Sequence, residues 1–522
     1  MMNADPSPPS ILLPADPPRD FRGEWTVDAE RRGAFAEHSG ILRALPVAVA
    51  VPEDADDVAT LMRWAAEHGI ALVPRAAGTG MPGGNIGPGI AVDLKTRFGT
   101  IGPVDAARRT MRIEPGVTLG DLNRAAVPDG LQFPVDPSSA DRASMGGIIA
   151  NNSGGSHTVR YGSARGWIQS LDVVLADGTR VTTTRGARDE HPRLREILDQ
   201  VDAIIAEDPV RIEARWPKVR KNSSGYALRE YLRSGDAVDL FVGSEGTLGM
   251  VTGATVRLAP IPAARGLALL EFTALEAAGA AVHRILELEP ATCEMIDRTF
   301  IDLVRDSGED PGYPLRPGLE AILFVEMEGD SVNEVARKLE AVRAAMADVA
   351  DHVSLATDPH EQERFWHVRH AASPLIARTA GRRVSMQFIE DGVVPVDRLA
   401  DYIRLLREVL ARHALPAVIF GHAGDGHLHV NPLVDITKPG WRAEAEAIVY
   451  EVAEGVARLG GTMAGEHGDG RLRAPLLETI WGPELTACFR AVKDAFDPLG
   501  ILNPGVILPL PGQRPLDAIK YA

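Results

Sequence analysis

Apolar and polar positions along the chain recur with two periods, one typical of helices and one typical of strands. Residues 46–52 form a β-rich apolar run. Residues 54–69 then carry apolar side chains at the spacing of one helical face and end in a glycine, and residues 70–75 return to an apolar run. This pattern predicts a strand, a helix and a second strand at the start of the folded chain.

The rhythm of the pattern changes near residue 262. Up to that point, short β-branched runs alternate with glycine-rich loops, and residues 258–266 carry the prolines and glycine typical of a domain boundary. Beyond it, apolar runs at 267–272 and 321–328 alternate with helical patterns at 275–288 and 332–349. These repeated units predict a second α+β domain with a helix-covered antiparallel sheet.

Composition narrows the possible partners and surroundings. The 55 Lys and Arg residues against 72 Asp and Glu give a net charge of −17, which argues against nucleic acid or an anionic membrane as a partner. No apolar run approaches the ~20 residues of a membrane span, and the N-terminus lacks the pattern of a secretory signal. Two cysteines, Cys293 and Cys488, indicate a reducing cytoplasm and are too few for an iron–sulfur cluster made by this chain alone.

Two histidine-bearing segments, 421–429 and 465–470, suggest a metal site. Asp425 and Gly426 lie between apolar runs and predict a two-residue hairpin turn, which would place His422 opposite His429 with Cβ atoms about 5 Å apart. Glu466 could then supply a third ligand and leave one position open, with His467 beside the metal as a free base. Solvent-facing histidines on a hairpin are the simpler alternative. A non-haem iron oxygenase is a further alternative, because such enzymes also use two histidines and one carboxylate.

Three glycine-rich regions carry Ser, Thr or Asn, at residues 75–85, 137–155 and 243–249. The first follows a strand but leads into another strand, so it is neither a Rossmann fingerprint nor a P-loop. Such a loop can hold phosphates only through consecutive backbone N–H groups. Three such loops in one domain indicate an extended pyrophosphate ligand.

Together these segments resemble the FAD-linked oxidases of the vanillyl-alcohol-oxidase type, in the branch of D-lactate, glycolate and D-2-hydroxyglutarate dehydrogenases. The resemblance runs from about residue 40 to 508 and rests on PRAAGTGMPGGN, PSSADRASMGGIIANNSGG, KNSSGYAL, VGSEGTLGMVTGATVRL, GHAGDGHLH, GEHGDG and FDPLGILNPG. It implies an α+β fold, with a two-subdomain FAD-binding domain of the PCMH type, a ferredoxin-like cap domain and a C-terminal segment that returns to the flavin domain. The expected parts are a disordered proline-rich tail (1–24), the FAD-binding domain (25–262), the cap with the metal site (263–478), the FAD-contacting segment (479–510) and a tail (511–522).

The resemblance implies which residues contact FAD. The first loop would hold the pyrophosphate, Glu245, Gly249 and Val251 would lie nearer the adenine, and Asn503 would close over the cofactor. No histidine lies in the first loop, so we expect non-covalent FAD. The expected FAD contacts are Pro74, Arg75, Ala76, Ala77, Gly78, Thr79, Gly80, Gly83, Gly84, Asn85, Pro137, Ser138, Ser139, Gly146, Gly147, Asn151, Ser153, Gly154, Glu245, Gly249, Val251 and Asn503.

The resemblance also assigns the chemistry. His422, His429 and Glu466 match the ligands of a divalent ion, which we expect to be zinc or manganese, acting as a Lewis acid on the substrate hydroxyl. His467 matches a general base that takes the hydroxyl proton while hydride passes to flavin N5. His427 shares a strand face with His429 and could compete as a ligand.

Four residues are expected to contact the substrate. Arg369 matches an arginine that grips a carboxylate, although without the family a helix-surface arginine is equally reasonable. Ser373 and Asn431 could add polar contacts, and Asn222 could face the flavin ring or belong to a structural turn. Ile389 aligns where hydroxyglutarate-type members carry lysine, which favours smaller or less charged 2-hydroxy acids.

The predicted function is FAD- and metal-dependent oxidation of a D-2-hydroxy acid. One alternative is a flavin-fold transferase of the alkyl-dihydroxyacetone-phosphate synthase kind, and another is a non-catalytic flavin-binding subunit of a larger dehydrogenase complex. With no cluster of its own, the chain is expected to pass electrons to a separate soluble carrier, quinone or iron–sulfur partner protein. A cytoplasmic homodimer is expected from base rates.

Overall fold

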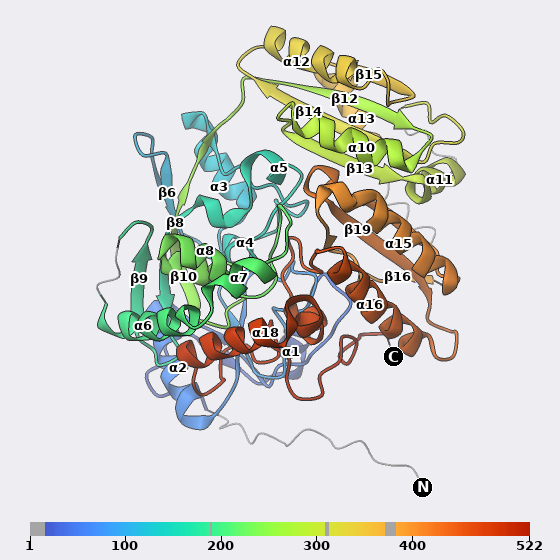
Figure 1. Ribbon diagram of the computed structural model, residues 1–522. Helices are drawn as coiled ribbons and strands as arrows, with labels where there is room; N and C mark the ends of the chain where they lie inside the picture. Colours follow the sequence, from blue (N-terminus) through green and yellow to red (C-terminus); the bar gives the residue numbers. More distant parts are fainter. Residues whose placement is uncertain (1–15, 188–190, 308–312, 371–382, 522) are drawn as a thin grey trace.

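The predicted strand, helix and strand at the start of the chain are confirmed by the computed structural model, which describes residues 16–187, 191–307, 313–370 and 383–521. They are β2 (Ala48–Val51), α2 (Ala55–His68) and β3 (Leu72–Arg75). Asp54 caps α2 by accepting the N–H groups of Asp56 and Asp57, and Gly69 ends the helix with φ 63°. These elements form the blue part of Figure 1.

The described part of the first half contains two larger sheets and a two-stranded one, in which β7 (Leu131–Gln132) pairs with β11 (Ala259–Pro260). β1 (Glu24–Thr26), β2, β4 (Ile90–Asp93) and β3 form a four-stranded sheet in the order β1-β2-β4-β3, with β2, β4 and β3 parallel. An antiparallel sheet follows in the order β5-β6-β10-β8-β9. Its strands are β5 (Ile101–Asp105), β6 (Thr110–Ile113), β8 (Ile168–Val174), β9 (Arg180–Thr184) and β10 (Met250–Arg257).

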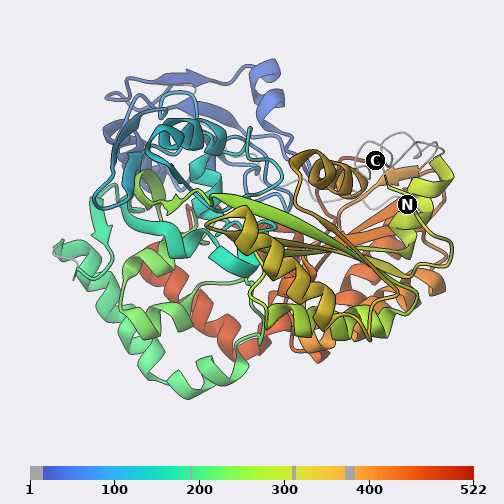
Figure 2. The same cartoon turned by 90° about the horizontal axis from the view of Figure 1, so that it is seen from above.

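The second half forms the predicted antiparallel sheet, in the order β15-β12-β14-β13-β18-β19-β16, with β17 on β19. Helices cover both faces, and Figure 2 shows this cap beside the first domain. The strands are β12 (Ala264–Phe272), β13 (Thr292–Asp297), β14 (Ala321–Gly329), β15 (His352–Ala356), β16 (Arg383–Ser385), β17 (Gly392–Val393), β18 (Ala417–Gly421) and β19 (His427–Asp435). The helices are α10 (Leu275–Leu286), α12 (Val332–Ala345), α15 (Leu399–Arg412) and α16 (Trp441–Arg458) on one face, and α11 (Arg298–Ser307) and α13 (Pro359–His370) on the other.

The chain then crosses back to the first domain through α18 (Leu477–Phe496). Its apolar face, including Trp481 and Phe489, shares one core with α6 (Pro192–Ala206), and Figure 1 shows α18 in red beneath the green helices. This agrees with the expected return of the C-terminal segment. No helix in the described part of the chain is long and apolar enough to cross a membrane.

Both expected tails are partly packed, which differs from the prediction. Phe21 is buried in the core of the first domain, and Arg22 pairs with Asp57. At the other end, Leu516 is fully buried against the cap, and the Lys520 N–H bonds to the Ile41 carbonyl. Apolar side chains in proline-rich surroundings therefore hold these segments against the domains.

A polar cluster joins the two domains. His157, in the first domain, bonds to Asp136 through Nδ1 at 2.6 Å and to Glu326 of β14 through Nε2 at 2.9 Å. Burial lowers the pKa of His157, but the two carboxylates outweigh this and raise it to about 10. The protonated imidazole therefore ties β14 to the first domain.

Candidate functional site

A cavity of about 610 Å³ lies between the two domains. One wall consists of glycine-rich loops from the first domain, and the other consists of histidines and carboxylates from the cap and the 465–470 loop. A volume of this size suits a cofactor or drug-sized ligand. The predicted pyrophosphate loops and the predicted metal site therefore face one space.

The glycine wall has the form of a cradle. Gly147 lies in the short helix α4 (Met145–Ala150), and a Cβ built on it would meet no atom within 4 Å and would enter the cavity space. The neighbouring loop is held by a hydrogen bond from the Ala77 N–H to the Ser144 hydroxyl at 3.0 Å. These features fit an extended ligand held close to the backbone, as FAD requires.

Glu245 links the glycine-rich wall of the cavity to the loop of residues 465–470. Its carboxylate accepts the N–H groups of Asp469 at 2.8 Å and Gly470 at 3.0 Å. Asn503 donates to the carbonyls of Gly84 at 2.7 Å and Glu245 at 2.9 Å. Glu245 still lines the cavity, whereas Asn503 is fully buried behind it, so Asn503 fastens two loops together and does not face the cofactor space.

The histidine hairpin differs from the predicted one. A 3₁₀ turn at Ala423–Asp425 lengthens the connection, and His429 pairs with Phe420 of β18, not with His422. Gly426 takes the left-handed conformation expected of Asp-Gly, with φ 70°, but the loop holds more than two residues. His422 follows the end of β18, and its ring still reaches His429.

Three potential ligand atoms converge at one point of the cavity wall. His422 Nε2 lies 3.3 Å from His429 Nε2 and 3.2 Å from Glu466 Oε1, and His429 Nε2 lies 3.4 Å from the same oxygen. All three side chains line the cavity. Two imidazoles and one carboxylate are a donor set that zinc and related divalent ions accept.

A second layer of charges orients these ligands. His422 Nδ1 bonds to Glu294 of β13, whose other oxygen accepts Arg369 Nε at 3.2 Å and Nη2 at 2.9 Å. His429 Nδ1 donates to the Glu390 carbonyl at 3.0 Å. Such partners fix the imidazole orientation, so that Nε2 of both rings points to the convergence point.

His467 lies beside this cluster with one ring nitrogen engaged. Its Nδ1 is 3.0 Å from both oxygens of Glu390, and its Nε2 is 3.7 Å from Glu466 Oε1. Burial lowers the pKa of His467, but Glu390 and Asp391 outweigh this and raise it to about 9. A cation at the three ligand atoms would oppose protonation of the ring. With Nδ1–H given to Glu390, Nε2 is the atom available for proton transfer.

Lys221 and His427 lie directly behind the ligands. Lys221 Nζ is 2.6 Å from Glu466 Oε2, and both Lys221 and His422 outweigh burial and hold the pKa of Glu466 well below its ordinary value. His427 is fully buried, with Nδ1 3.4 Å from Lys221 Nζ and Nε2 2.9 Å from Asp391. Burial and Lys221 lower the pKa of His427 to about 3. His427 Nε2 forms no hydrogen bond to the described residues, and His427 belongs with His422, His429 and Glu466 to a group whose possible ligand atoms lie within 4.8 Å of one another, so it stays a candidate ligand.

Most of the predicted site residues line the main cavity, including Arg369 and Asn431. Gly83 is buried behind the loop, and Asn222 lines a different cavity, where its amide oxygen accepts the Ser224 N–H at 3.2 Å. Ser373 lies outside the described residues. The predicted FAD contacts on the cavity wall are Pro74, Arg75, Ala76, Ala77, Gly78, Thr79, Gly80, Gly84, Asn85, Pro137, Ser138, Ser139, Gly146, Gly147, Asn151, Ser153, Gly154, Glu245, Gly249 and Val251.

Ile389, which aligns with a lysine of the hydroxyglutarate-type members, does not line the main cavity. Ile389 is fully buried in the cap core, whereas Gln387, two positions earlier, lines the cavity. Sequence reasoning also missed Glu294, Glu390 and Lys221. The signal for Glu294 is a carboxylate in the middle of the buried strand β13, which ends in a second one, Asp297, since a charge there must be paired when buried.

Comparison with known proteins identifies the class. A family model described as "FAD linked oxidases, C-terminal domain" matches residues 261–507, and one described as "FAD binding domain" matches residues 46–184. The glycolate oxidase subunit GlcD of Bacillus subtilis is 32% identical over 89% of this chain and 89% of that protein. The D-lactate dehydrogenase of Archaeoglobus fulgidus is 30% identical, over 88% and 91% respectively. The D-2-hydroxyglutarate dehydrogenase of Pseudomonas putida is 32% identical over 96% of this chain but only 52% of that protein, so this chain spans about half of it.

Solved structures agree on the fold. The chain resembles 4-ethylphenol oxidase from Gulosibacter chungangensis with a TM-score of 0.68 at 17% identity, covering 93% of this chain and 94% of that one. It resembles alkyldihydroxyacetonephosphate synthase with a TM-score of 0.64 at 15% identity, over 92% and 83%. At such identities these likenesses concern the fold alone. The chain therefore has the vanillyl-alcohol-oxidase-type fold and belongs to the FAD-linked oxidases, which makes it an FAD-dependent oxidoreductase.

Proposed function

We propose that this protein oxidises a D-2-hydroxy acid to the 2-oxo acid, using non-covalent FAD and a divalent ion. The observation that carries the proposal is the meeting of His422, His429 and Glu466 with His467 and Arg369 on the wall opposite the glycine cradle. Relatives named glycolate oxidase, D-lactate dehydrogenase and D-2-hydroxyglutarate dehydrogenase support the substrate class.

The two bound groups would supply the chemistry that side chains lack. FAD accepts the hydride. A divalent ion on His422, His429 and Glu466, zinc or manganese, supplies Lewis acidity toward the 2-hydroxyl. The residues present fit both groups, since the cradle leaves space along the backbone and the three ligand atoms lie 3.2–3.4 Å apart.

The side chains position the substrate and move its proton. Within the described residues, Arg369 gives Nε and one Nη2 proton to Glu294, which leaves Nη1 and the second Nη2 proton for a substrate carboxylate. His467 Nε2 would take the hydroxyl proton, while Glu390 holds its Nδ1–H. Asn431 and Gln387 line the remaining space and would contact the substituent on C2.

The electron acceptor and assembly are expected from class and base rates. We propose that a separate carrier reoxidises the flavin, whether a soluble carrier, a quinone or an iron–sulfur partner protein. Cytoplasmic location and a homodimer remain proposals of the same kind.

An anaerobic absorbance titration tests the function. The flavin bands of the purified protein are recorded before and after addition of D- and L-forms of lactate and 2-hydroxyglutarate, and of glycolate, with and without EDTA. Bleaching by one D-acid that EDTA suppresses is the expected result. Bleaching that is insensitive to EDTA would remove the metal from the mechanism, and flavin that no 2-hydroxy acid bleaches would contradict the proposed reaction.

A further inference from the structure

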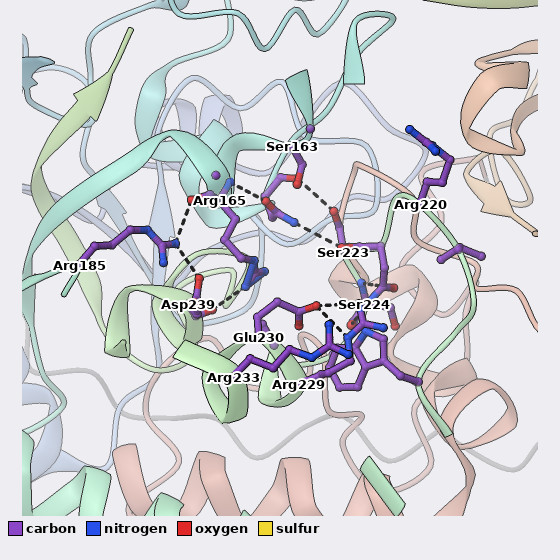
Figure 3. Close-up of a pocket in the computed structure, with 18 of the residues that line it drawn as sticks. Ser163, Arg165, Arg185, Arg220, Ser223, Ser224, Arg229, Glu230, Arg233 and Asp239 are labelled. Carbon is purple, nitrogen blue, oxygen red and sulfur yellow. Dashed lines mark hydrogen bonds and ion pairs between the residues drawn. The ribbon is translucent and has the colours of Figure 1, made fainter. Parts of the chain in front are cut away.

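A second cavity, of about 540 Å³, lies in the first domain (Figure 3). Six arginines and only two carboxylates line it, although the whole chain carries a net charge of −17. The arginines come from separate elements of the first domain, which converge here. They are Arg165, Arg185, Arg220, Arg229, Arg233 and Arg257, and the two carboxylates are Glu230 and Asp239.

Arg165 lies at the centre of this group. Its Nη1 donates to the backbone carbonyl of Asp239 at 2.6 Å. Among the described residues, no carboxylate oxygen lies within ion-pair distance of its guanidinium. Burial lowers the pKa of Arg165 by more than the nearby carboxylates of Glu230 and Asp239 raise it, yet an arginine remains charged. A largely buried cation with a backbone partner has capacity for an anion.

The neighbouring arginines are held in place by ion pairs, two of which are with the carboxylates that line the cavity. Arg185 pairs with Asp239 at 2.6 Å, and Arg233 pairs with Glu213 at 2.8 Å. Arg229 pairs with Glu230 at 2.9 Å and lies 5.1 Å over the Trp216 ring. A guanidinium has five N–H donors, so one such pair leaves further donors for a second acceptor. Figure 3 shows Arg229 and Arg233 below Arg165, around one space.

The shape of the site points to a small molecule. The guanidinium groups line a concavity in the size range of ligand pockets, whereas a partner protein needs a broad surface of roughly 800 Å². Ser163 and Asn222 add polar groups, and Trp216 gives one apolar wall. Converging guanidinium groups select oxygen acceptors of phosphate or carboxylate type.

Two serines that line the second cavity also contact the loop of residues 465–470. Ser223 Oγ donates to the Gly465 carbonyl at 3.1 Å, and Ser224 Oγ donates to Asp469 at 3.2 Å. The adjacent Lys221 reaches Glu466 in the main cavity. Only the segment of residues 221–224 would therefore separate a ligand in this cavity from the proposed metal ligand Glu466.

We propose that this arginine-lined cavity is a second ligand site that binds a small dianion bearing phosphate or carboxylate oxygens. The inference does not depend on the proposed reaction, because it rests on the residues of the first domain alone.

Isothermal titration calorimetry of the FAD-saturated protein tests the site. Inorganic phosphate and succinate serve as the two probes, because saturation with FAD blocks the pyrophosphate cradle. At least one probe should bind, and Arg165→Gln should weaken it about tenfold or more, as loss of a charge-assisted hydrogen bond does. Arg233→Gln, at an exposed position, should weaken it as well and guards against misfolding of the first variant. The stronger probe tells phosphate-type from carboxylate-type ligands.

Two controls locate the binding. Arg108→Gln removes an equal charge from an exposed position that is 81% accessible, and it should leave the affinity unchanged. Arg369→Gln removes one of the three arginines that line the main cavity, the others being Arg75 and Arg142, and should also leave the affinity unchanged. Loss of binding in Arg369→Gln but not in Arg165→Gln would overturn the proposal by placing the dianion in the main cavity. Absence of binding of both probes to the wild-type protein would overturn it too.

Discussion

The two walls of the main cavity use different physical means. The first-domain wall is lined by glycines and backbone amides that would hold the cofactor, and few of its side chains carry charge. The opposite wall is a network of buried charges in which Lys221, Glu466, His422, Glu294 and Arg369 follow one another. A backbone wall tolerates side-chain change wherever space remains. A charged wall does not, because loss of one member leaves another unpaired in a buried place.

The largest expected effect follows from a substitution in the charged wall. His467→Asn should slow flavin reduction by about 10²–10⁴-fold, the usual contribution of a general base, and should leave the flavin bound. Stopped-flow absorbance at saturating substrate measures it. An unchanged rate of flavin reduction would remove His467 from the proton transfer.

The charges between the domains should make stability depend on pH. The folded protein raises the pKa of His157 to about 10 from an ordinary value near 6.5, so its contribution is complete below about pH 6.5 and is lost as pH rises toward 10. His157→Gln should therefore lower the free energy of unfolding by on the order of a few kcal/mol at pH 6 and by much less at pH 10. Urea denaturation at both pH values measures this, and equal losses would contradict it.

Removing an outer charge should act on the metal. Glu294→Gln keeps the shape of the side chain but weakens its hold on His422 and Arg369. We expect divalent-ion affinity to fall about 10–100-fold, as for other second-layer partners of a metal-bound histidine. Equilibrium dialysis with zinc and with manganese measures it. Asp401→Asn, an exposed carboxylate in α15, is the matched control and should have no effect.

The last change, on the backbone wall, should have an effect similar in size to that of Glu294→Gln. Gly147→Ala adds one methyl group toward the cofactor space and should weaken FAD binding by about 1–3 kcal/mol, the usual cost of overpacking. Gly33→Ala is the matched control, because its Cβ also meets no atom within 4 Å but lies outside the cavity. Flavin content after dialysis measures both. Full retention of FAD in Gly147→Ala would show that the cradle does not contact the cofactor at this point.

The same contrast explains what could be predicted from the sequence. Each glycine-rich loop of the cradle is a continuous stretch of sequence, so a local pattern is enough to recognise it. The periods of apolar residues likewise predict α2 and the cap sheet correctly. The charged network joins residues such as Lys221 and Glu466, which lie 245 positions apart, and no local pattern relates them. His422 and His429 were brought together correctly, but through a longer turn than Asp-Gly suggested.

The misplaced residues share one cause. Asn222 lines the second cavity instead of the main one, and Asn503 and Ile389 are buried away from both cavities. Along an extended segment, a shift of one residue turns a side chain to the opposite side. A family match without coordinates does not show which side a given residue faces. Gln387 and Ile389 show this on the same short stretch.

The division of Glu466 between two partners has a consequence for how the protein would load the proposed divalent ion. Oε2 rests on Lys221, while Oε1 faces the two histidines. The lysine acts as a permanent counter-ion, so the carboxylate is never left alone in the interior when the divalent ion departs. Chelation should therefore yield an inactive protein that is still folded and that can bind the metal again, because the fold does not need the metal in order to form.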